Sequence, residues 1–147
     1  ICTRNLEELN IKYAILGHSE RRRYFKESHQ DIANKVDLCL AANIIPIVCI
    51  DQDYLEAQAQ LINSELLSKC VVAYEPLAAI GTGEIAPVDE VSKVVKEIKS
   101  IFGQVPVLYG GSVNPENIVP YLEVTDGVLV GGASLDAKTF ANLIQSE

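Results

Sequence analysis

The 147-residue chain contains no methionine, and it begins at Ile1 within a pattern typical of a helix. Because a natural reading frame begins with methionine, we expect an N-terminal segment to precede Ile1 in the complete protein. No apolar stretch approaches the roughly 18 residues that span a membrane, and no signal peptide is visible. A cytoplasmic protein without membrane partners is therefore expected.

Basic residues are also few, with 12 Lys and Arg against 20 Asp and Glu, for a net charge of −8. No basic stripe is present, so nucleic acid is not expected as a partner. The four cysteines show no metal-ligand spacing: Cys49 and Cys70 fall in strand-like runs, and Cys39 lies on an apolar helix face. We expect buried, reduced thiols and no metal site.

Five short apolar runs are present, and each ends in a polar or glycine cluster: 13–16, 46–50, 70–74, 105–109 and 128–130. Such runs, without alternation, are typical of strands buried on both faces of a parallel sheet. Amphipathic helical patterns lie between them, including one helix at 54–68 and another at 88–102. Ser28, Asn114 and Asp136 are expected to cap further helices. The alternation predicts right-handed βαβ units after an opening helix.

The length of the chain leaves two architectures open. A closed (β/α)8 barrel typically needs about 250 residues, so 147 residues hold about five of its units. An open parallel sheet of five strands could be complete at this length. In both cases residues 1–147 are expected to form a single unit, because no linker or low-complexity tract interrupts the pattern. The polar clusters share the carboxyl-end rim, where the chemistry of α/β proteins is found.

One cluster holds a carboxylate at the end of a buried strand. Glu75 follows the run 70–74, adjoins Pro76 and precedes a loop that contains Gly81. A carboxylate in that position is costly to desolvate unless it has a function, which makes Glu75 a candidate general base. The loop could move over a ligand and offer it backbone N–H groups.

Four motifs, in order, resemble the triosephosphate isomerase family: YAILGHSERR at 13–22, AYEP and AIGTG at 73–76 and 79–83, YGGSV at 109–113, and VGGASL at 130–135. The similarity covers the chain from its first helix to its end and corresponds to the C-terminal portion of the family, from the helix before the fourth strand. It implies a (β/α)8 TIM barrel. It also implies a homodimeric, cytoplasmic isomerase of glycolysis and gluconeogenesis, which interconverts dihydroxyacetone phosphate and glyceraldehyde 3-phosphate without metal or cofactor.

The resemblance assigns roles to particular residues. Glu75 is the base at carbon, and His18 is the electrophile that polarises and protonates oxygen. Ser19 and Glu20 support the site, with Glu20 bracing the family's lysine. A helical turn is expected to open after His18, and its positive end favours a neutral imidazole, whose N–H suits an enediolate oxygen.

The substrate phosphate is expected to bind main-chain N–H groups at Gly81, Gly111, Gly131 and Gly132, together with the hydroxyl of Ser112. For each glycine alone, a simple turn role is equally compatible with the sequence. Their shared position after strands favours the phosphate interpretation.

Three features of the sequence depart from the family pattern, and a few charged residues are expected to have no role in the site. Ala78 stands where the family usually has tryptophan, Asp51-Gln52 replaces its Gly-Glu, and the stretch 49–75 is short. His29 is expected on the surface, and arginines 21–23 in surface or interface ion pairs.

The largest departure is a missing cation. The family's Asn-x-Lys motif and its intersubunit loop are expected upstream of Ile1. A phosphate beside ionised Glu75, on a chain of net charge −8, calls for a cation, and no strand here ends in Lys or Arg. We therefore expect residues 1–147 alone to be inactive.

Two other interpretations remain. A different phosphosugar barrel enzyme, such as an epimerase or a synthase of aromatic amino-acid biosynthesis, would share the glycine turns but has no need of this histidine and Glu-Pro pair. A non-catalytic, truncated or pseudoenzyme form of the same family would keep every motif without turnover.

Overall fold

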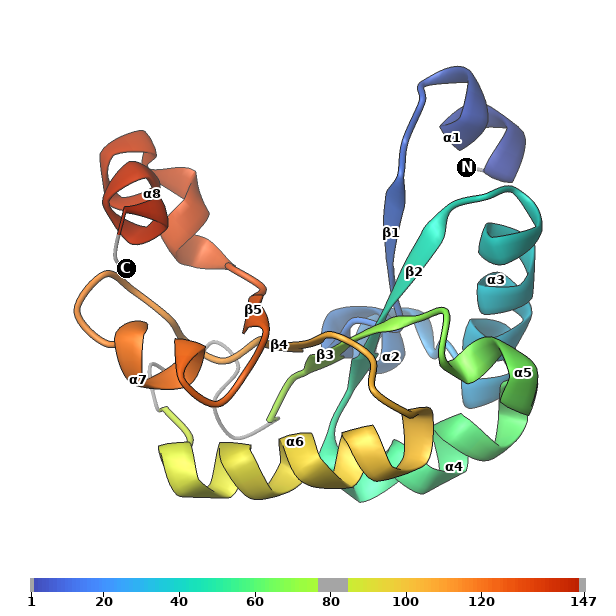
Figure 1. Ribbon diagram of the computed structural model, residues 1–147. Coiled ribbons are helices and arrows are strands. Elements are labelled where there is room, and N and C mark those ends of the chain that lie inside the picture. The colour runs from blue at the N-terminus through green and yellow to red at the C-terminus, as the bar shows by residue number, and fades with distance from the viewer. Residues whose placement is uncertain (1, 77–84, 146–147) are drawn as a thin grey trace.

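The computed structural model describes residues 2–76 and 85–145 (Figure 1). Ala78 and Gly81 lie outside the described residues. The strands are β1 (Tyr13–Leu16), β2 (Ile45–Ile50), β3 (Val71–Tyr74), β4 (Val107–Tyr109) and β5 (Gly127–Val128). The helices are α1 (Thr3–Glu8), α2 (Ser19–Phe25), α3 (His29–Ala41), η1 (Gln52–Tyr54), α4 (Leu55–Leu61), α5 (Ser64–Leu67), α6 (Val88–Phe102), α7 (Val119–Leu122), η3 (Gly132–Leu135) and α8 (Ala137–Ile144).

The five strands form one parallel sheet in the order β1-β2-β3-β4-β5, which confirms the predicted α/β fold. The register pairs Tyr13 with Ile45 and Ile47 with Val71. A doubly wound sheet reverses its strand order partway, whereas right-handed crossovers in sequential order keep the helices on one side. Figure 1 shows α3, α4 and α6 on the same side of the sheet. The topology is therefore that of part of a (β/α)8 barrel.

The core lies between the sheet and these helices. Val48, Val72 and Val107 of three successive strands are fully buried. The predicted apolar helix faces are confirmed, because the buried residues of α3 and α6 recur at helical spacing: Ile32, Val36 and Cys39, and Val91, Val94, Val95, Ile98 and Phe102. Burial of these faces supplies most of the hydrophobic stabilisation.

The expectation that the strands are buried on both faces is wrong at the first strand. Tyr13 and Ile15 of β1 keep 55% and 49% of their surface exposed. Within the described part of the chain, β1 pairs only with β2, and β5 only with β4. Tyr13 and Ile15 are two residues apart and share one face of the sheet, whereas Leu16 on the other face is buried. An apolar run alone therefore does not fix which faces are covered.

The helix predicted over 54–68 is interrupted. Ile62 is extended, with φ −86° and ψ 134°, and separates α4 from α5. The side chain of Asn63 accepts a hydrogen bond from the Glu65 N–H and so caps a new helix. The Asn63 side chain caps a new helix at Ser64 and so favours a break over continuation of the first helix. The apolar periodicity runs through the break, so it did not reveal the cap.

The three predicted caps have mixed outcomes. Ser28 forms a capping box with Asp31, and Asp136 accepts from the Thr139 N–H at the start of α8. Asn114 accepts from the N–H groups of Glu116 and Asn117, but the segment forms a turn, and α7 begins only at Val119. The Asn-Pro pair therefore closes a turn instead of starting a helix.

The cysteines are free thiols, and Cys39, Cys49 and Cys70 are buried, as predicted. Cys70 lies immediately before β3 instead of within it. Burial raises the pKa of the Cys70 thiol to about 12, so it stays protonated near neutral pH. These side chains act as small apolar groups.

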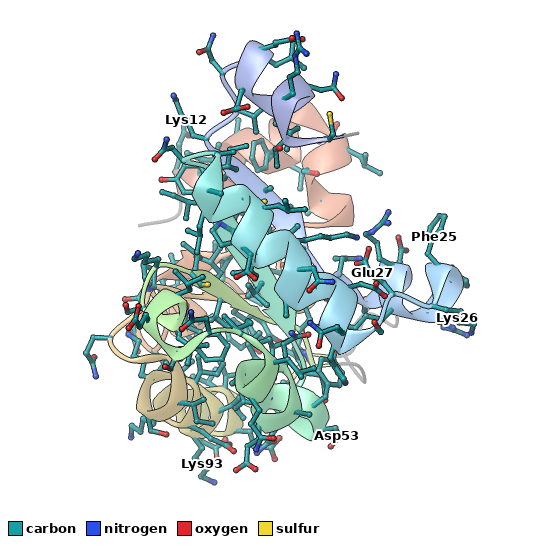
Figure 2. The ribbon with its side chains drawn as sticks, turned by 90° about the vertical axis from the view of Figure 1, so that its right-hand side faces the viewer. Lys12, Phe25, Lys26, Glu27, Asp53 and Lys93 are labelled. Carbon is teal, nitrogen blue, oxygen red and sulfur yellow. The ribbon has the colours of Figure 1, made fainter. Side chains whose placement is uncertain are left out.

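The outer surface carries charged side chains, and Figure 2 shows Lys12, Lys26, Asp53 and Lys93 at the periphery. Phe25, at the end of α2, projects among them and is 71% exposed. None of the described helices is both long enough and apolar enough to cross a bilayer.

Gly17, between β1 and α2, combines a positive φ with close packing on its Cα. Its φ is +69°, and a Cβ there would lie 2.7 Å from Ile32 Cδ1 and 2.9 Å from Arg22 Nη2. Ile32 is fully buried, and the Arg22 guanidinium is held by several hydrogen bonds, so neither can move aside cheaply.

Gly17→Ala is therefore expected to destabilise the protein more than Gly103→Ala does. Gly103 also has a positive φ, +85°, but an added Cβ would meet nothing within 4 Å. Gly103→Ala adds backbone strain of about 1–3 kcal/mol, whereas Gly17→Ala adds about 1–3 kcal/mol of overpacking to similar strain. Urea unfolding measures both, and equal losses would show that the predicted clash is absent.

Candidate functional site

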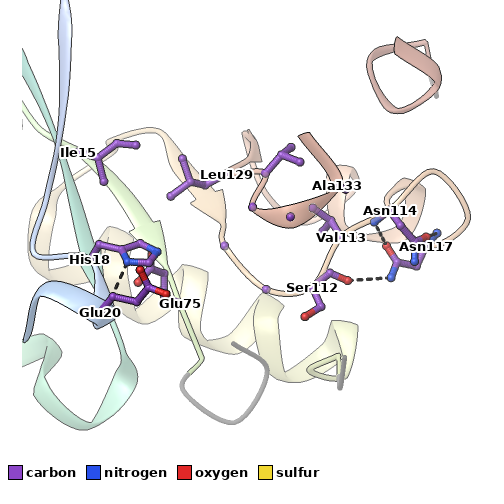
Figure 3. Close-up of a pocket in the computed structure, with 15 residues that line it drawn as sticks. Ile15, His18, Glu20, Glu75, Ser112, Val113, Asn114, Asn117, Leu129 and Ala133 are labelled. Carbon is purple, nitrogen blue, oxygen red and sulfur yellow. Dashed lines mark hydrogen bonds and ion pairs between the residues drawn. The ribbon is translucent and has the colours of Figure 1, made fainter. Parts of the chain in front are cut away.

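A cavity of about 570 Å³ opens at the carboxyl ends of the strands. It is lined by fifteen residues: Ile15, His18, Glu20, Glu75, Gly110, Gly111, Ser112, Val113, Asn114, Asn117, Leu129, Val130, Gly131, Gly132 and Ala133. Figure 3 shows His18 and Glu75 together on one side, with Ser112 and Asn117 on the other. Six of the predicted catalytic and phosphate-binding residues thus meet in one cavity, while Gly81 lies outside the described residues.

Glu75 is only 1% exposed, although it follows β3 at the rim. Its Oε2 accepts a hydrogen bond from the Ser19 N–H at 3.1 Å, and its Oε1 lies 3.5 Å from His18 Nε2. Gly110 makes room for it, because a Cβ at that position would come within 2.9 Å of Glu75 Cγ. The carboxylate is therefore fixed in place and faces the imidazole.

The Cys49 thiol adjoins the same carboxylate. Burial and then the negative charge of Glu75 raise the pKa of this thiol. Cys49 is fully buried, so it remains a neutral S–H at neutral pH. The thiol packs beside the carboxylate without adding charge.

His18 is the N-cap of α2, and its Nδ1 accepts a hydrogen bond from the Glu20 N–H at 3.3 Å. An imidazole nitrogen that accepts cannot carry a proton, so the ring proton of the neutral form sits on Nε2. That N–H is directed toward Glu75 and the cavity (Figure 3). The helix predicted after His18 is confirmed, and it selects this tautomer.

The glycines on the other side of the cavity differ in whether the surrounding packing leaves room for a side chain. A Cβ on Gly131 or Gly132 would meet nothing within 4 Å, so space beside this turn is open. At Gly111, by contrast, a Cβ would lie 2.1 Å from the Tyr109 hydroxyl oxygen. Tyr109 stacks on Tyr121 and accepts a hydrogen bond from the Ala86 N–H. Packing alone thus explains the glycine at 111, while 131 and 132 leave room for a ligand.

Sequence reasoning missed the two asparagines of the cavity. Asn114, which was assigned only to capping, and Asn117 both line it. Asn117 donates to the Ser112 carbonyl oxygen at 3.0 Å and accepts from the Asn114 N–H at 2.9 Å. The pair holds the Ser112 turn, and the only sequence signal was the Asn-Pro cap directly after Gly-Gly-Ser.

The surface prediction is wrong for His29 and Arg22. Both are half-buried, and the Arg22 guanidinium lies 2.9 Å from His29 Nδ1. His29 also packs against the Tyr54 ring, with centroids 5.4 Å apart. The predicted ion pair is present at Arg21, which binds Glu27. Helical periodicity places Arg22 toward α3 and β2 and leaves Arg21 and Arg23 exposed.

The charge balance of the cavity is negative. Its lining holds two carboxylates, Glu20 and Glu75, and, among the described residues, no lysine or arginine. The described residues also contain no group of three His, Cys, Asp or Glu side chains that could hold a metal ion. The protein groups directed at a ligand are a carboxylate, a neutral imidazole, amides and a glycine turn.

A sequential parallel sheet with a Glu–His pair facing glycine turns at its carboxyl ends defines a barrel-type α/β protein with a candidate proton-transfer site. The triosephosphate isomerase family model matches residues 1–147. The chain is 44% identical to triosephosphate isomerase of Mesomycoplasma hyorhinis, over 98% of the chain and 65% of that relative. It is 38% identical to the enzymes of Streptococcus thermophilus and Clostridium tetani, over 95% of the chain. The chain belongs to the triosephosphate isomerase family.

The coverage of these relatives is partial. The chain spans about two thirds of their length, 65% and 66% for the Mesomycoplasma and Streptococcus proteins. The match to this family excludes the alternative that the chain is an epimerase or a synthase of aromatic amino-acid biosynthesis.

Proposed function

We propose that this chain provides the Glu75–His18 part of an isomerase site that interconverts dihydroxyacetone phosphate and glyceraldehyde 3-phosphate. The observation that carries the proposal is the 3.5 Å approach of His18 Nε2 to Glu75 Oε1, in a cavity whose opposite side is a glycine turn with open space beside it. A base next to a neutral N–H donor is what an aldose–ketose proton shift needs.

In this mechanism, Glu75 removes a proton from the carbon next to the carbonyl. The electron pair moves toward the carbonyl oxygen and forms an enediolate, to which His18 Nε2–H donates. His18 gives its Nε2 proton to this oxygen and takes up the proton of the neighbouring hydroxyl, so that the oxygens exchange a proton. Return of the proton from Glu75 to the adjacent carbon then completes the exchange of aldehyde and ketone. The Ser19 N–H fixes the carboxylate at 3.1 Å, so little reorganisation is needed at the moment of reaction.

The substrate phosphate would lie at the other side of the cavity, against main-chain N–H groups of Gly111, Gly131 and Gly132 and near Ser112. Open space beside Gly131 and Gly132 supports this assignment. Gly81 would add a further N–H, and Glu20 would brace a lysine supplied from elsewhere in the folded protein. No metal or cofactor is required by this chemistry.

By family membership we further propose that residues 1–147 act as a single unit within a cytoplasmic homodimer of glycolysis and gluconeogenesis. The exposed apolar side chains of β1, such as Tyr13 and Ile15, are compatible with further strands packing there.

The direct test is an isomerase assay on the full-length translation product that contains these residues, with each triose phosphate supplied in turn. We expect interconversion in both directions. Binding of triose phosphates without interconversion would instead favour the non-catalytic form of the family.

A polypeptide of residues 1–147 alone is expected to show no isomerase activity above background. The described cavity offers no lysine or arginine to balance the phosphate and Glu75, and a buried site without that cation binds the dianion weakly. The same assay measures this on the purified polypeptide, once circular dichroism has shown that it is folded. Robust turnover by the isolated polypeptide would show that the missing cation is not needed.

A further inference from the structure

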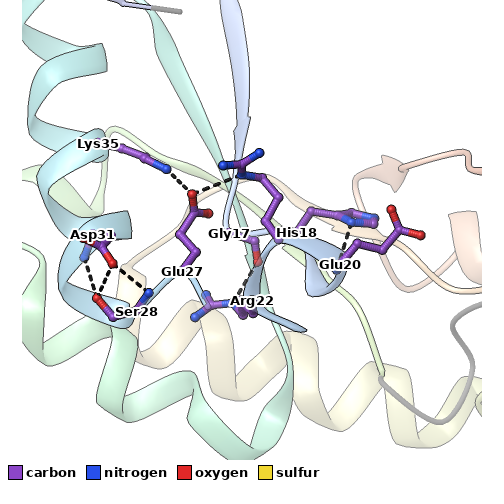
Figure 4. Close-up of polar contacts among 9 residues, drawn as sticks. Gly17, His18, Glu20, Arg22, Glu27, Ser28, Asp31 and Lys35 are labelled. Carbon is purple, nitrogen blue, oxygen red and sulfur yellow. Dashed lines mark hydrogen bonds and ion pairs between the residues drawn. The ribbon is translucent and has the colours of Figure 1, made fainter. Parts of the chain in front are cut away.

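The Arg22 side chain makes polar contacts with four groups near the site, although it does not line the cavity. Its Nε donates to the Gly17 carbonyl at 2.8 Å, and its Nη2 donates to the Cys49 carbonyl at 3.0 Å. Nη2 also donates to Gln58 Oε1 at 3.1 Å, and Nη1 lies 2.9 Å from His29 Nδ1. Figure 4 shows the link from Arg22 to Gly17, directly before His18.

The two carbonyls belong to the segments that carry the reacting groups. Gly17 directly follows β1 and immediately precedes His18. Cys49 lies in β2, and its thiol adjoins the Glu75 carboxylate. One guanidinium therefore ties the backbone next to the electrophile to the backbone beside the base.

The other partners of Arg22 hold the guanidinium and do not neutralise it. His29 and Gln58 are uncharged acceptors in this geometry, and the Tyr54 ring lies 4.4 Å below the guanidinium carbon. A guanidinium only donates, so His29 Nδ1 must accept and be unprotonated. Burial lowers the pKa of Arg22, and electrostatic attraction by Tyr54, Cys49, Glu27 and Glu75 opposes this shift. A half-buried cation held by five neutral groups has a fixed orientation.

The steric packing agrees with this view. A Cβ on Gly17 would come within 2.9 Å of Arg22 Nη2, so the guanidinium packs directly against the turn before His18. A lysine carries all its N–H donors on a single nitrogen, so it lacks the planar fork with which arginine spans both carbonyls.

We propose that Arg22 is a positioning residue for the His18–Glu75 pair, and that its hydrogen bonds to the Gly17 and Cys49 carbonyls set the separation of base and electrophile. This inference rests on the proposed function of the cavity. It adds that the geometry of the proton-transfer pair is fixed from outside the cavity, through main-chain carbonyls.

The test compares Arg22→Lys, Arg22→Gln and the control Arg23→Gln in the full-length translation product. Arg23 is exposed on the same helix, and its guanidinium lies 5.3 Å from the Tyr24 ring centroid. We expect kcat to fall about 10- to 100-fold in both Arg22 variants, as misplacement of catalytic groups does. KM should stay within about twofold, because Arg22 does not line the cavity in which the substrate would bind. Arg23→Gln should change neither.

A second readout needs no turnover. The Ser19 N–H donates to Glu75, so its hydrogen exchange reports the register of the His18 turn against the carboxylate. Arg22→Gln, or Arg22→Lys if the first does not fold, should accelerate exchange at Ser19 and leave the amides of α6 unchanged. If the wild-type protein had no isomerase activity but the Arg22 variant still accelerated exchange at Ser19 alone, the positioning role would be supported and the proposed function refuted.

Two results would overturn the inference. One is a kcat and a Ser19 exchange rate that both equal those of the wild type. The other is a joint change in kcat, KM and exchange throughout α6, which would show that Arg22 only supports the fold.

Discussion

Glu75→Gln is expected to lower isomerase turnover of the full-length protein by about 10³-fold or more, because the base at carbon is lost. The amide is nearly isosteric, and its oxygen can still accept the Ser19 N–H that now binds Oε2. Folding should therefore be preserved while proton abstraction is not. Steady-state assays in both directions, with KM compared, measure the effect.

Glu116→Gln is the matched control for this substitution. Glu116 is exposed in the turn after Asn114, so the same chemical change there should leave kcat and the thermal midpoint unchanged. Near-normal turnover in the Glu75 variant, with the fold intact, would remove Glu75 from the mechanism.

His18→Gln is expected to lower kcat by about 10²-fold, as loss of one preorganised donor to an oxyanion does. The ring proton sits on Nε2 because Nδ1 accepts from the Glu20 N–H, and no other described side chain presents an N–H 3.5 Å from the Glu75 carboxylate. His18→Asn keeps a good N-cap for α2 but is too short to donate into the cavity, and it should show a similar loss.

Ser28→Ala controls for the loss of a helix cap as such. Ser28 caps α3 outside the cavity lining, and its removal should cost about 1 kcal/mol of stability without affecting kcat. A comparable fall in kcat in Ser28→Ala would mean that the His18 effect reflects helix stability and not donation.

Much of the fold follows from local patterns in the sequence. The apolar runs gave the strand positions because parallel strands need continuous burial, and the Ser28 and Asp136 caps formed as expected. The site was predictable because each motif follows a strand, and parallel strands bring their carboxyl ends to one rim. The resemblance to a known family then assigned roles to Glu75 and His18.

The predictions that were wrong concern features that depend on tertiary packing. Exposure of Tyr13 and Ile15 depends on what covers their face of the sheet, and no residue within the run encodes that. The break at Ile62 reflects a capping competition that periodicity does not measure. The burial of Arg22 and His29 depends on the packing of α2 against α3 and β2, so composition alone placed both on the surface.

The most direct measurement of the central claim is deuterium exchange during turnover. Full-length protein is incubated with dihydroxyacetone phosphate in D₂O, and carbon-bound deuterium is followed by NMR in substrate and product. The account predicts deuterium at the carbons between which the proton moves in the wild type, and none above background in Glu75→Gln. Incorporation at the wild-type rate in the Glu75→Gln variant would contradict the assignment of Glu75 as the base.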